Sequence, residues 1–419
     1  MENNSKIKIV FVGHVDHGKS TLIGRILYDT NSIPADKLAD LVKKNDSAKD
    51  ELDFSYVMDH FEEERNQGIT IDTSQTFFKS KKREYVIIDA PGHVEFILNM
   101  MTGASQADAA ILLVDASEGI KEQTRRHACI LSILGIKQVI IAVNKMDLID
   151  YEEEKYNLIV EELQEFLSGL NLHLVNSVPV SSLYGDNIVN KSDNIKWYKG
   201  KSLIDCMDSL LKETCVTVPY AVLAVQDIYN VKESEKNRRI TVGRVEAGTL
   251  YNSGSINILP TGEKAKIQSI RIFNKSRQMA LKGECVGLCF DKPVFVERGN
   301  VICTDNHQLF VSSCFEAAFF WLGKTPLQKN SRLLLKCSTQ ETSCAVKEIL
   351  SKTDSSTMEM VCDNMDILSK YEIGQVVIET KVPLVLCTTT NIPALRHFVI
   401  MVDDTIVAGG IVIENLLRS

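Results

Sequence analysis

The chain has 419 residues, of which 44% are hydrophobic and 24% charged, and its formal net charge is −8. This length exceeds what one hydrophobic core supports, so the composition predicts a globular protein of several domains. The acidic total provides no global positive field and weighs against nucleic acid as a partner. No apolar run is long enough to span a membrane, and residues 1–4 lack the layout of a signal peptide. We therefore expect a cytoplasmic protein without a membrane partner.

The 11 cysteines are scattered singly, and no Cys-x-x-Cys pair occurs. Cys285 and Cys289 are the closest two, and no second cluster of cysteine or histidine lies near them in the sequence. This arrangement favours free thiols in a reducing compartment over a zinc site.

The first half of the chain alternates apolar strands with helical stretches. Near-continuous apolar strands separated by helices predict a doubly wound, mostly parallel sheet that is covered on both faces. Ligands bind to such a sheet at the carboxyl ends of its strands. We expect strands at residues 7–12, 85–88, 110–114, 139–143 and 175–180, and helices at residues 22–27, 94–104, 121–135, 152–168 and 203–213.

Beyond about residue 214, short strands alternate with turn residues, and no long helical pattern occurs. This spacing predicts two β-barrels or sandwiches. The most polar stretch, residues 229–238, is expected to form the exposed tip of a hairpin. The expected domains are an α/β domain at residues 1–213, a β-barrel at residues 219–304 and a second β-barrel at residues 309–419.

A glycine-bounded loop lies between the first expected strand and the first expected helix. Strand, loop and helix in this order are the setting of a phosphate-binding P-loop, in which glycines let several N–H groups point at one anion. Lys19 would bridge the outer phosphates of a nucleotide, and Ser20 would ligate magnesium. Taken alone, the segment would also suit a glycine-rich turn before a core helix. The nucleotide-binding candidates in this loop are Gly13, His14, Val15, Asp16, His17, Gly18, Lys19, Ser20 and Thr21.

Two later segments are candidate nucleotide switches. Asp89 ends an apolar strand, where its carboxylate could reach magnesium through water, and Gly92 could offer an N–H group to the terminal phosphate. Thr70 lies between the P-loop and Asp89, and it could add its hydroxyl to magnesium and its N–H group to the same phosphate. Each segment alone would also suit an ordinary loop or turn. The candidate metal ligands are therefore Ser20, Thr70 and Asp89.

A further polar segment, Asn-Lys-Met-Asp, follows the fourth expected strand. Asp147 could accept hydrogen bonds from the ring N–H and the exocyclic amine of guanine. Adenine would leave this carboxylate unpaired, so the site should select guanine over adenine by a factor on the order of 10⁴. Lys145 would lie along the plane of the base, and Asn144 would tie the loops together. The loop after the last expected strand would contact the guanine carbonyl through its backbone, at Ser181, Ser182 and Leu183.

The segments GHVDHGKST, GIT, DAPGH, NKMD and SSL, in this order, resemble the translation-factor class of GTPases, close to the elongation factors that deliver aminoacyl-tRNA. The resemblance covers nearly the whole chain. It implies a GTP-binding domain followed by two β-barrels, with GTP and Mg²⁺ as cofactors. It also implies that His93 positions the attacking water, that Val15 and Ile69 form an apolar gate, and that Asp16 orders the P-loop. A histidine suits the positioning of the water because it can donate or accept a proton near neutral pH. The candidate catalytic residues are His93, Lys19, Asp16 and Thr70.

A second set of stretches lies at residues 22–29, 123–127, 185–192, 197–198, 315–317, 321–322, 326–327 and 373–374. These stretches resemble the regulatory GTPase subunit of bacterial sulfate adenylyltransferase. This resemblance implies that GTP hydrolysis drives the formation of adenylylsulfate from ATP and sulfate on a separate adenylyltransferase subunit, in a heterodimer or larger hetero-oligomer. His14, His17 and Ala90 match the elongation-factor form instead. The alternative is therefore an elongation-factor-like GTPase that delivers aminoacyl-tRNA to the ribosome.

Overall fold

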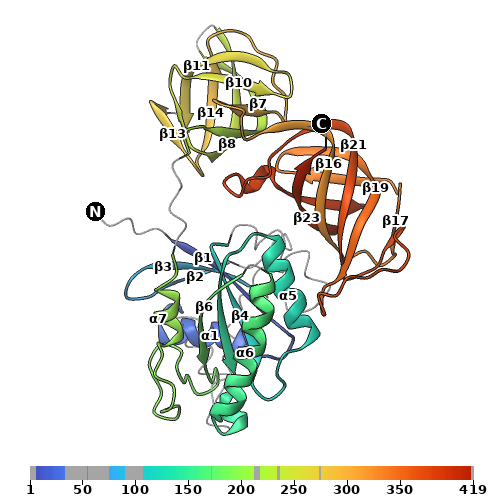
Figure 1. Cartoon of the computed structure of the whole chain (residues 1–419). Coiled ribbons are helices and arrows are strands. Elements are labelled where there is room, and N and C mark those ends of the chain that lie inside the picture. The colour runs from blue at the N-terminus through green and yellow to red at the C-terminus, as the bar shows by residue number, and fades with distance from the viewer. Residues whose placement is uncertain are drawn as a thin grey trace. The chain divides into compact units, whose positions relative to one another are not determined.

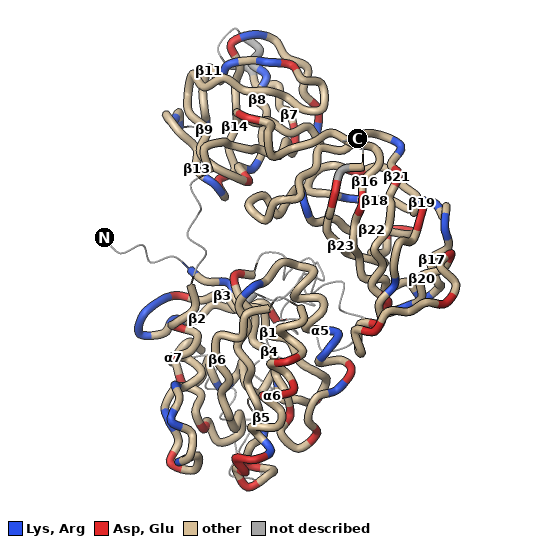
Figure 2. Tube along the Cα trace, in the orientation of Figure 1, with Lys and Arg blue, Asp and Glu red and all other residues tan. Residues whose placement is uncertain are grey.

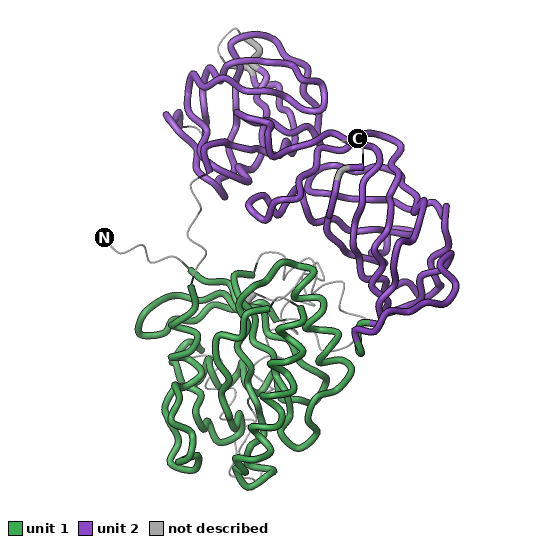
Figure 3. The backbone as a smooth tube through the Cα atoms, viewed as in Figure 1, with its two compact units in different colours: residues 1–213, 355–357 green, residues 214–354, 358–419 purple. Residues whose placement is uncertain are grey.

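The computed structural model describes residues 6–33, 54, 75–89, 107–170, 172–211, 218–233, 236–272 and 275–416. The chain divides into two compact units (Figure 3). The first unit comprises residues 1–213 and 355–357, and the second comprises residues 214–354 and 358–419. The finer division expected at residues 304–309 stays a prediction.

A sheet of six strands forms the centre of the described part of the first unit, in the order β2-β3-β1-β4-β5-β6 (Figure 1). Five strands run parallel to one another, namely β1, β3, β4, β5 and β6. The edge strand β2 pairs antiparallel with β3. The mostly parallel sheet is therefore confirmed. The sequence analysis did not identify β2, because this edge strand has only two adjacent apolar residues in Gln-Thr-Phe-Phe-Lys. The bounds are β1 Ile7–Gly13, β2 Gln75–Lys79, β3 Glu84–Asp89, β4 Ala109–Asp115, β5 Gln138–Asn144 and β6 His173–Pro179.

The helices of the first unit pack against this sheet. One of them, α7, ends at Met207 rather than near residue 213 as expected. The chain leaves the helix at Asp208, whose carboxylate accepts hydrogen bonds from the hydroxyls of Ser80 and Tyr85 at 2.7 and 2.6 Å. The helix expected near residues 94–104 lies outside the described residues. The described helices are α1 Lys19–Asp29, α5 Glu122–Ile133, α6 Glu153–Gly169 and α7 Leu203–Met207, with the 3₁₀ turn η2 at Met146–Ile149.

The central strands are buried on both faces, which explains their nearly continuous apolar sequences. Ile9 of β1 and Ile111 of β4 belong to a cluster that includes Leu22 and Ile26 of α1 and Leu203 of α7. α5 contacts β1 and β4, and α6 contacts β5 and β6, on the other face (Figure 1). Full burial of one such aliphatic side chain contributes about 1.5–3 kcal/mol. The sheet is therefore a stable base for the loops at the carboxyl ends of its strands.

The second unit contains two barrels of antiparallel strands. In the first barrel, β10 joins the two ends of the sheet. This strand pairs with both β15 and β11, which completes the order β10-β15-β7-β8-β14-β11. β7 and β8 pair along their whole length, so the polar stretch 229–238 lies at the distal end of a β7–β8 hairpin and most of its residues are in paired strand. A strand accepts polar residues where one of its faces is solvated. The bounds are β7 Val222–Glu233, β8 Lys236–Ala247, β9 Thr249–Tyr251, β10 Ser255–Leu259, β11 Glu263–Ile272, β12 Lys275–Arg277, β13 Met279–Leu281, β14 Cys285–Phe290 and β15 Val301–Cys303.

The second barrel is closed, with the strand order β16-β21-β19-β18-β22-β23. A separate apolar cluster joins the two barrels through Leu259 and Val301 of the first barrel and Val385 and Leu395 of the second. The two barrels expected after the α/β domain are therefore confirmed as a fold. The bounds are β16 Phe310–Trp321, β17 Leu327–Gln328, β18 Leu333–Cys337, β19 Gln340–Asp354, β20 Ile367–Leu368, β21 Glu372–Leu386, η3 Pro393–Leu395, β22 His397–Val402 and β23 Thr405–Asn415.

Charged side chains of both signs are interspersed along the traces of the two units (Figure 2). Within the described ranges, no helix combines the length and the apolar character needed to cross a membrane.

Candidate nucleotide-binding site

The P-loop follows β1 and leads into α1, at the carboxyl end of the parallel sheet. Gly18 precedes the helix with a φ of 85°, in the left-handed region that favours glycine. A β-carbon at this position would lie 2.5 Å from Nδ2 of Asn144, so a larger residue would collide with that amide. Asp16 also has a positive φ, of 64°. The turn ends in the first N–H groups of α1, which point along the helix axis and suit an anion.

Lys19 and Asp89 form an ion pair beside the P-loop. Lys19 begins α1, whereas Asp89 ends β3, the parallel neighbour of β1, and Lys19 Nζ lies 2.8 Å from Asp89 Oδ1. Each side chain is only 10% exposed. Opposite charges at this distance and burial attract each other, and each offsets the cost of burying the other. Ser20 and Thr21 occupy the first turn of α1, directly after Lys19.

The remaining candidates for this end of the site are only partly covered by the described residues. His14 and Val15 lie in the P-loop with half-buried side chains. Thr70, Gly92 and His93, like Ile69, lie outside the described residues.

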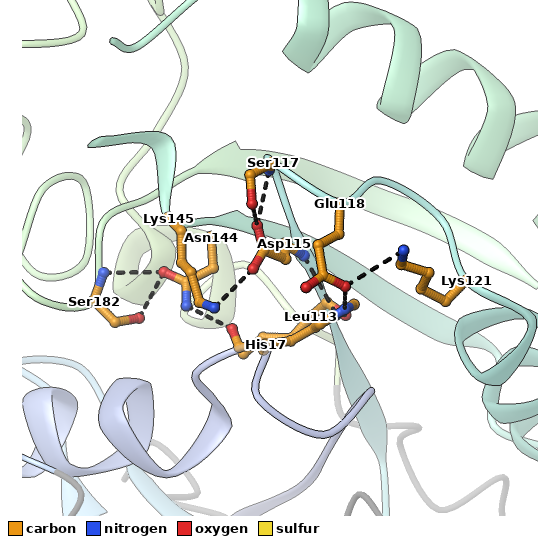
Figure 4. A network of polar contacts seen from close by, with 9 residues as sticks. All are labelled: His17, Leu113, Asp115, Ser117, Glu118, Lys121, Asn144, Lys145 and Ser182. Carbon is orange, nitrogen blue, oxygen red and sulfur yellow. Dashed lines mark hydrogen bonds and ion pairs between the residues drawn. The ribbon is translucent and has the colours of Figure 1, made fainter. Parts of the chain in front are cut away.

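Asn144 connects the P-loop to the loop that follows β6 (Figure 4). Its side-chain amide donates a hydrogen bond to the main-chain oxygen of His17 at 2.8 Å. Its side-chain oxygen accepts hydrogen bonds from the N–H group and the hydroxyl of Ser182 at 3.0 and 2.8 Å. Asn144 is 1% exposed, so water does not compete for these bonds. Three segments that are far apart in the sequence therefore meet around one buried side chain.

Asp115 belongs to this network but was not among the residues predicted from the sequence. It ends β4, and its Oδ2 lies 2.7 Å from Lys145 Nζ, while its Oδ1 accepts hydrogen bonds from the N–H group and hydroxyl of Ser117 at 2.8 and 2.6 Å (Figure 4). Burial opposes ionisation, but the hydrogen bonds from Lys145 and Ser117 prevail and hold the pKa of Asp115 below its ordinary value. The carboxylate therefore fixes Lys145. The sequence feature that could have identified Asp115 is its place at the carboxyl end of a buried strand.

Asp147 and Ser181 meet beside this network. The Ser181 hydroxyl donates a hydrogen bond to Asp147 Oδ1 at 2.5 Å. Asp147 is half-buried. The carbonyl of Leu183, in the same loop as Ser181, accepts a hydrogen bond from Arg25 Nη1 at 3.1 Å. The loop after β6 is therefore held both by the Asn-Lys-Met-Asp segment and by α1.

Two buried histidines lie next to the P-loop and to β4. Nδ1 of His17 accepts a hydrogen bond from the N–H group of Asp115 at 3.3 Å, and its Nε2 lies 3.8 Å from a carboxylate oxygen of Glu118. Burial lowers the pKa of His17, and burial together with the charge of Lys19 lowers the pKa of His127, in α5, to about 3. His127 is therefore neutral at pH 7.

The arrangement has two chemically different ends. The P-loop end offers N–H groups and the ammonium group of Lys19, which suit phosphate oxygens. The other end offers the Asp147 carboxylate, which suits a ring that presents two neighbouring donors. Asn144 lies between the two ends and bonds to both loops.

The elongation factor Tu GTP binding domain family matches residues 4–214, and the GTP-eEF1A C-terminal domain-like family matches residues 314–413. Elongation factor 1-alpha of Methanopyrus kandleri is 35% identical over 426 residues, which cover 97% of each chain. Sulfate adenylyltransferase subunit 1 of Psychromonas ingrahamii is 36% identical over 376 residues, which cover 89% of this chain and 79% of the relative. The protein of the same description from Bacteroides fragilis is 33% identical and covers 100% of this chain and 88% of its own length. The chain therefore belongs to the elongation factor Tu family of GTP-binding proteins, the translation-factor class of GTPases.

Proposed function

We propose that GTP binds across the two ends of this site, with its base at Asp147 and its phosphates at the P-loop. The observation that carries this proposal is the pair of hydrogen bonds by which Asn144 joins His17 to Ser182. These bonds make the phosphate loop and the base loops one structure. Lys145, held by Asp115 at 2.7 Å, would lie along the base plane, and the backbone at Leu183 would contact the guanine carbonyl.

The residues present fit a magnesium ion at the phosphate end. Mg²⁺ prefers hard oxygen ligands and is held in nucleotide sites by few protein groups together with phosphate oxygens. The Ser20 hydroxyl and the Asp89 carboxylate are such groups, with Thr70 as the third candidate. The bound ion supplies charge neutralisation of the phosphates. Lys19 Nζ lies 2.8 Å from Asp89 Oδ1, so we infer that this pair separates when nucleotide and cation bind, with Lys19 turning to the phosphates and Asp89 to the cation.

Catalysis in this proposal consists of positioning and electrostatics. Lys19 and the N–H groups of residues 13–21 stabilise the negative charge of the phosphates as the bond to the terminal phosphate breaks. Asp16 orders the P-loop. His93 would orient the attacking water, and Val15 and Ile69 would form the apolar gate beside it.

We infer further that GTP hydrolysis is coupled to a separate adenylyltransferase subunit that forms adenylylsulfate from ATP and sulfate. The relatives named sulfate adenylyltransferase subunit 1 support this role, since two of them align with 89% and 100% of the chain. The formal net charge of −8 also favours a protein partner over a nucleic acid. In this role, GTP turnover draws an unfavourable reaction forward.

Delivery of aminoacyl-tRNA to the ribosome is the second candidate. Elongation factor 1-alpha of Methanopyrus kandleri, 35% identical and aligned over 97% of both chains, favours it. The two roles predict different salt dependence. Binding to tRNA would weaken steeply as salt rises because counterions are released, whereas binding to a protein subunit through mixed contacts would respond much less.

The test is GTP hydrolysis by the purified full chain, alone and with a candidate adenylyltransferase subunit, ATP and sulfate. The proposal predicts that the partner raises hydrolysis and that adenylylsulfate forms faster with GTP than without it. Stimulation by ribosomes and aminoacyl-tRNA instead would replace the sulfate-activating role by the translation role.

A further inference from the structure

A closed circuit of hydrogen bonds passes through the carboxylate of Asp147 and returns to the main chain beside it. Ser181 donates its hydroxyl to that carboxylate at 2.5 Å. The main chain of Ser181 pairs with that of Asp186 in both directions, with N···O distances of 3.3 and 3.1 Å. The Tyr151 hydroxyl donates to Asp186 Oδ2 at 2.8 Å, and the Tyr151 N–H group donates to the carbonyl of Met146 at 2.9 Å. Met146 precedes Asp147, so the circuit returns to its starting point.

Tyr151 is held in this circuit by an uncommon backbone conformation. Asp150 and Tyr151 have φ values of 52° and 57°, both in the left-handed region that a residue with a side chain rarely adopts. Two such residues in succession cost free energy, and surrounding contacts must compensate for it. The indole of Trp197 donates to the Tyr151 carbonyl at 2.8 Å. Tyr151 is therefore fixed through its N–H group, its carbonyl and its hydroxyl.

Asp186 is the second anchor of the circuit. It is 8% exposed, so its carboxylate depends on hydrogen bonds from the protein. Oδ2 accepts from Tyr151, and Oδ1 accepts from the hydroxyl of Ser192 and, at 3.2 Å, from the amide of Asn194. These donors are neutral. Loss of one of them leaves a nearly buried charge with less stabilisation, so the position of Asp186 is sensitive to each donor.

We propose that Tyr151 and Asp186 are positioning residues that set the selectivity for guanine by fixing the orientation of Asp147. The inference rests on the proposed function of Asp147 as the carboxylate that reads the base. A carboxylate accepts two parallel hydrogen bonds only when its plane matches the two donors, whereas one hydrogen bond tolerates rotation. A loosened circuit therefore weakens the contact to the exocyclic amine of guanine more than it weakens the phosphate contacts.

The test compares Tyr151→Phe with Tyr156→Phe in the full chain. The first change removes only the hydroxyl that holds Asp186. Tyr156 is a matched control, because it lies on α6, is 5% exposed and donates its hydroxyl to Ser177 at 2.7 Å, outside the circuit. The dissociation constants of GDP and IDP are measured by calorimetry with Mg²⁺. IDP has hypoxanthine, which lacks the exocyclic amine, so the IDP/GDP ratio isolates that one contact.

We expect Tyr151→Phe to reduce the IDP/GDP ratio by about threefold to tenfold, the range of one hydrogen bond. We expect Tyr156→Phe to keep the wild-type ratio even if its thermal stability falls. Equal loss of affinity for both nucleotides in Tyr151→Phe, with an unchanged ratio, would overturn the positioning role. A wild-type protein that does not distinguish GDP from IDP would instead contradict the proposed function itself. Asp186→Asn, which removes the charge and keeps an acceptor, provides a second variant with the same expected direction.

Discussion

The amide of Asn144 donates to the main-chain oxygen of His17 at 2.8 Å, and this hydrogen bond joins the end of β5 to the P-loop. The two residues are 127 positions apart. The same side chain accepts two hydrogen bonds from Ser182, in the loop after β6. The geometry of the P-loop and that of the loop after β6 are therefore coupled through one nearly fully buried residue.

Asn144→Ala should weaken GDP binding on the order of 100-fold, because it leaves the His17 carbonyl and Ser182 without their partner and loosens both ends of the site. Gln138 provides a matched control at the opposite end of β5. Its amide also bonds to main chain in both directions, at Leu211, with distances of 2.6 and 2.9 Å. Gln138→Ala should lower stability and leave the affinity for GDP near the wild-type value. The dissociation constant of GDP is measured by calorimetry for both variants. Equal losses of affinity in the two variants would refute the coupling.

Asp147→Asn should reverse the preference for the base. An asparagine amide donates where the carboxylate accepts, so affinity for GDP should fall by roughly 100-fold or more. Xanthosine diphosphate, which has a carbonyl in place of the exocyclic amine, should bind the variant more tightly than the wild type. Asp150→Asn is the control, because Asp150 is exposed and asparagine tolerates its φ of 52°. If Asp147→Asn kept the wild-type preference for GDP over xanthosine diphosphate, Asp147 would not contact the base.

As the pH falls from about 6.5 toward 3, His127 should lower the free energy of unfolding of the protein. Burial holds its folded pKa at about 3, below the ordinary value of 6.5, so the unfolded chain takes up a proton that the folded protein does not. The contribution is present above pH 6.5 and is lost by about 1.4 kcal/mol per unit as the pH falls toward the folded pKa. His127→Leu should flatten this part of the curve. The readout is urea unfolding at several pH values, with exposed His173→Gln as the control; identical slopes in wild type and His127→Leu would rule the effect out.

Asp115→Asn should destabilise the protein at pH 7 by about 1–3 kcal/mol, because it removes the charged partner of Lys145 and weakens two hydrogen bonds from Ser117. The folded pKa of Asp115 is depressed, so its contribution is present above the ordinary value of 3.8 and is lost as the pH falls through the lower, folded value. The difference between variant and wild type should therefore shrink below about pH 4. A difference that stayed constant down to acid-induced unfolding would contradict this account of Asp115.

The main elements of the site could be predicted because each is a short segment at the end of an apolar strand. Gly18 and Lys19 are recognisable because their spacing reflects a local turn into a helix. Asp147 is recognisable because its carboxylate follows a buried strand of a parallel sheet. Physical constraints that act within a few residues leave a pattern in the sequence.

The rest of the site depends on contacts between segments that are distant in sequence. Tyr151 and Asp186 are 35 positions apart, and their hydrogen bond joins Tyr151, the second of two consecutive left-handed residues, to the loop after β6. Asp115 pairs with Lys145 because β4 and β5 are parallel neighbours with Asp115 opposite Asn144. Neither relationship has a local pattern, so neither was predicted.

The most direct test of the guanine-nucleotide site is calorimetric titration of the full chain with GDP and with ADP, both with Mg²⁺. If Asp147 reads the base while Asn144 joins it to the P-loop, GDP should bind on the order of 10⁴-fold more tightly than ADP, because adenine leaves the carboxylate unpaired. Similar affinities for GDP and ADP would show that the P-loop binds phosphate without recognition of the base, and would contradict the account.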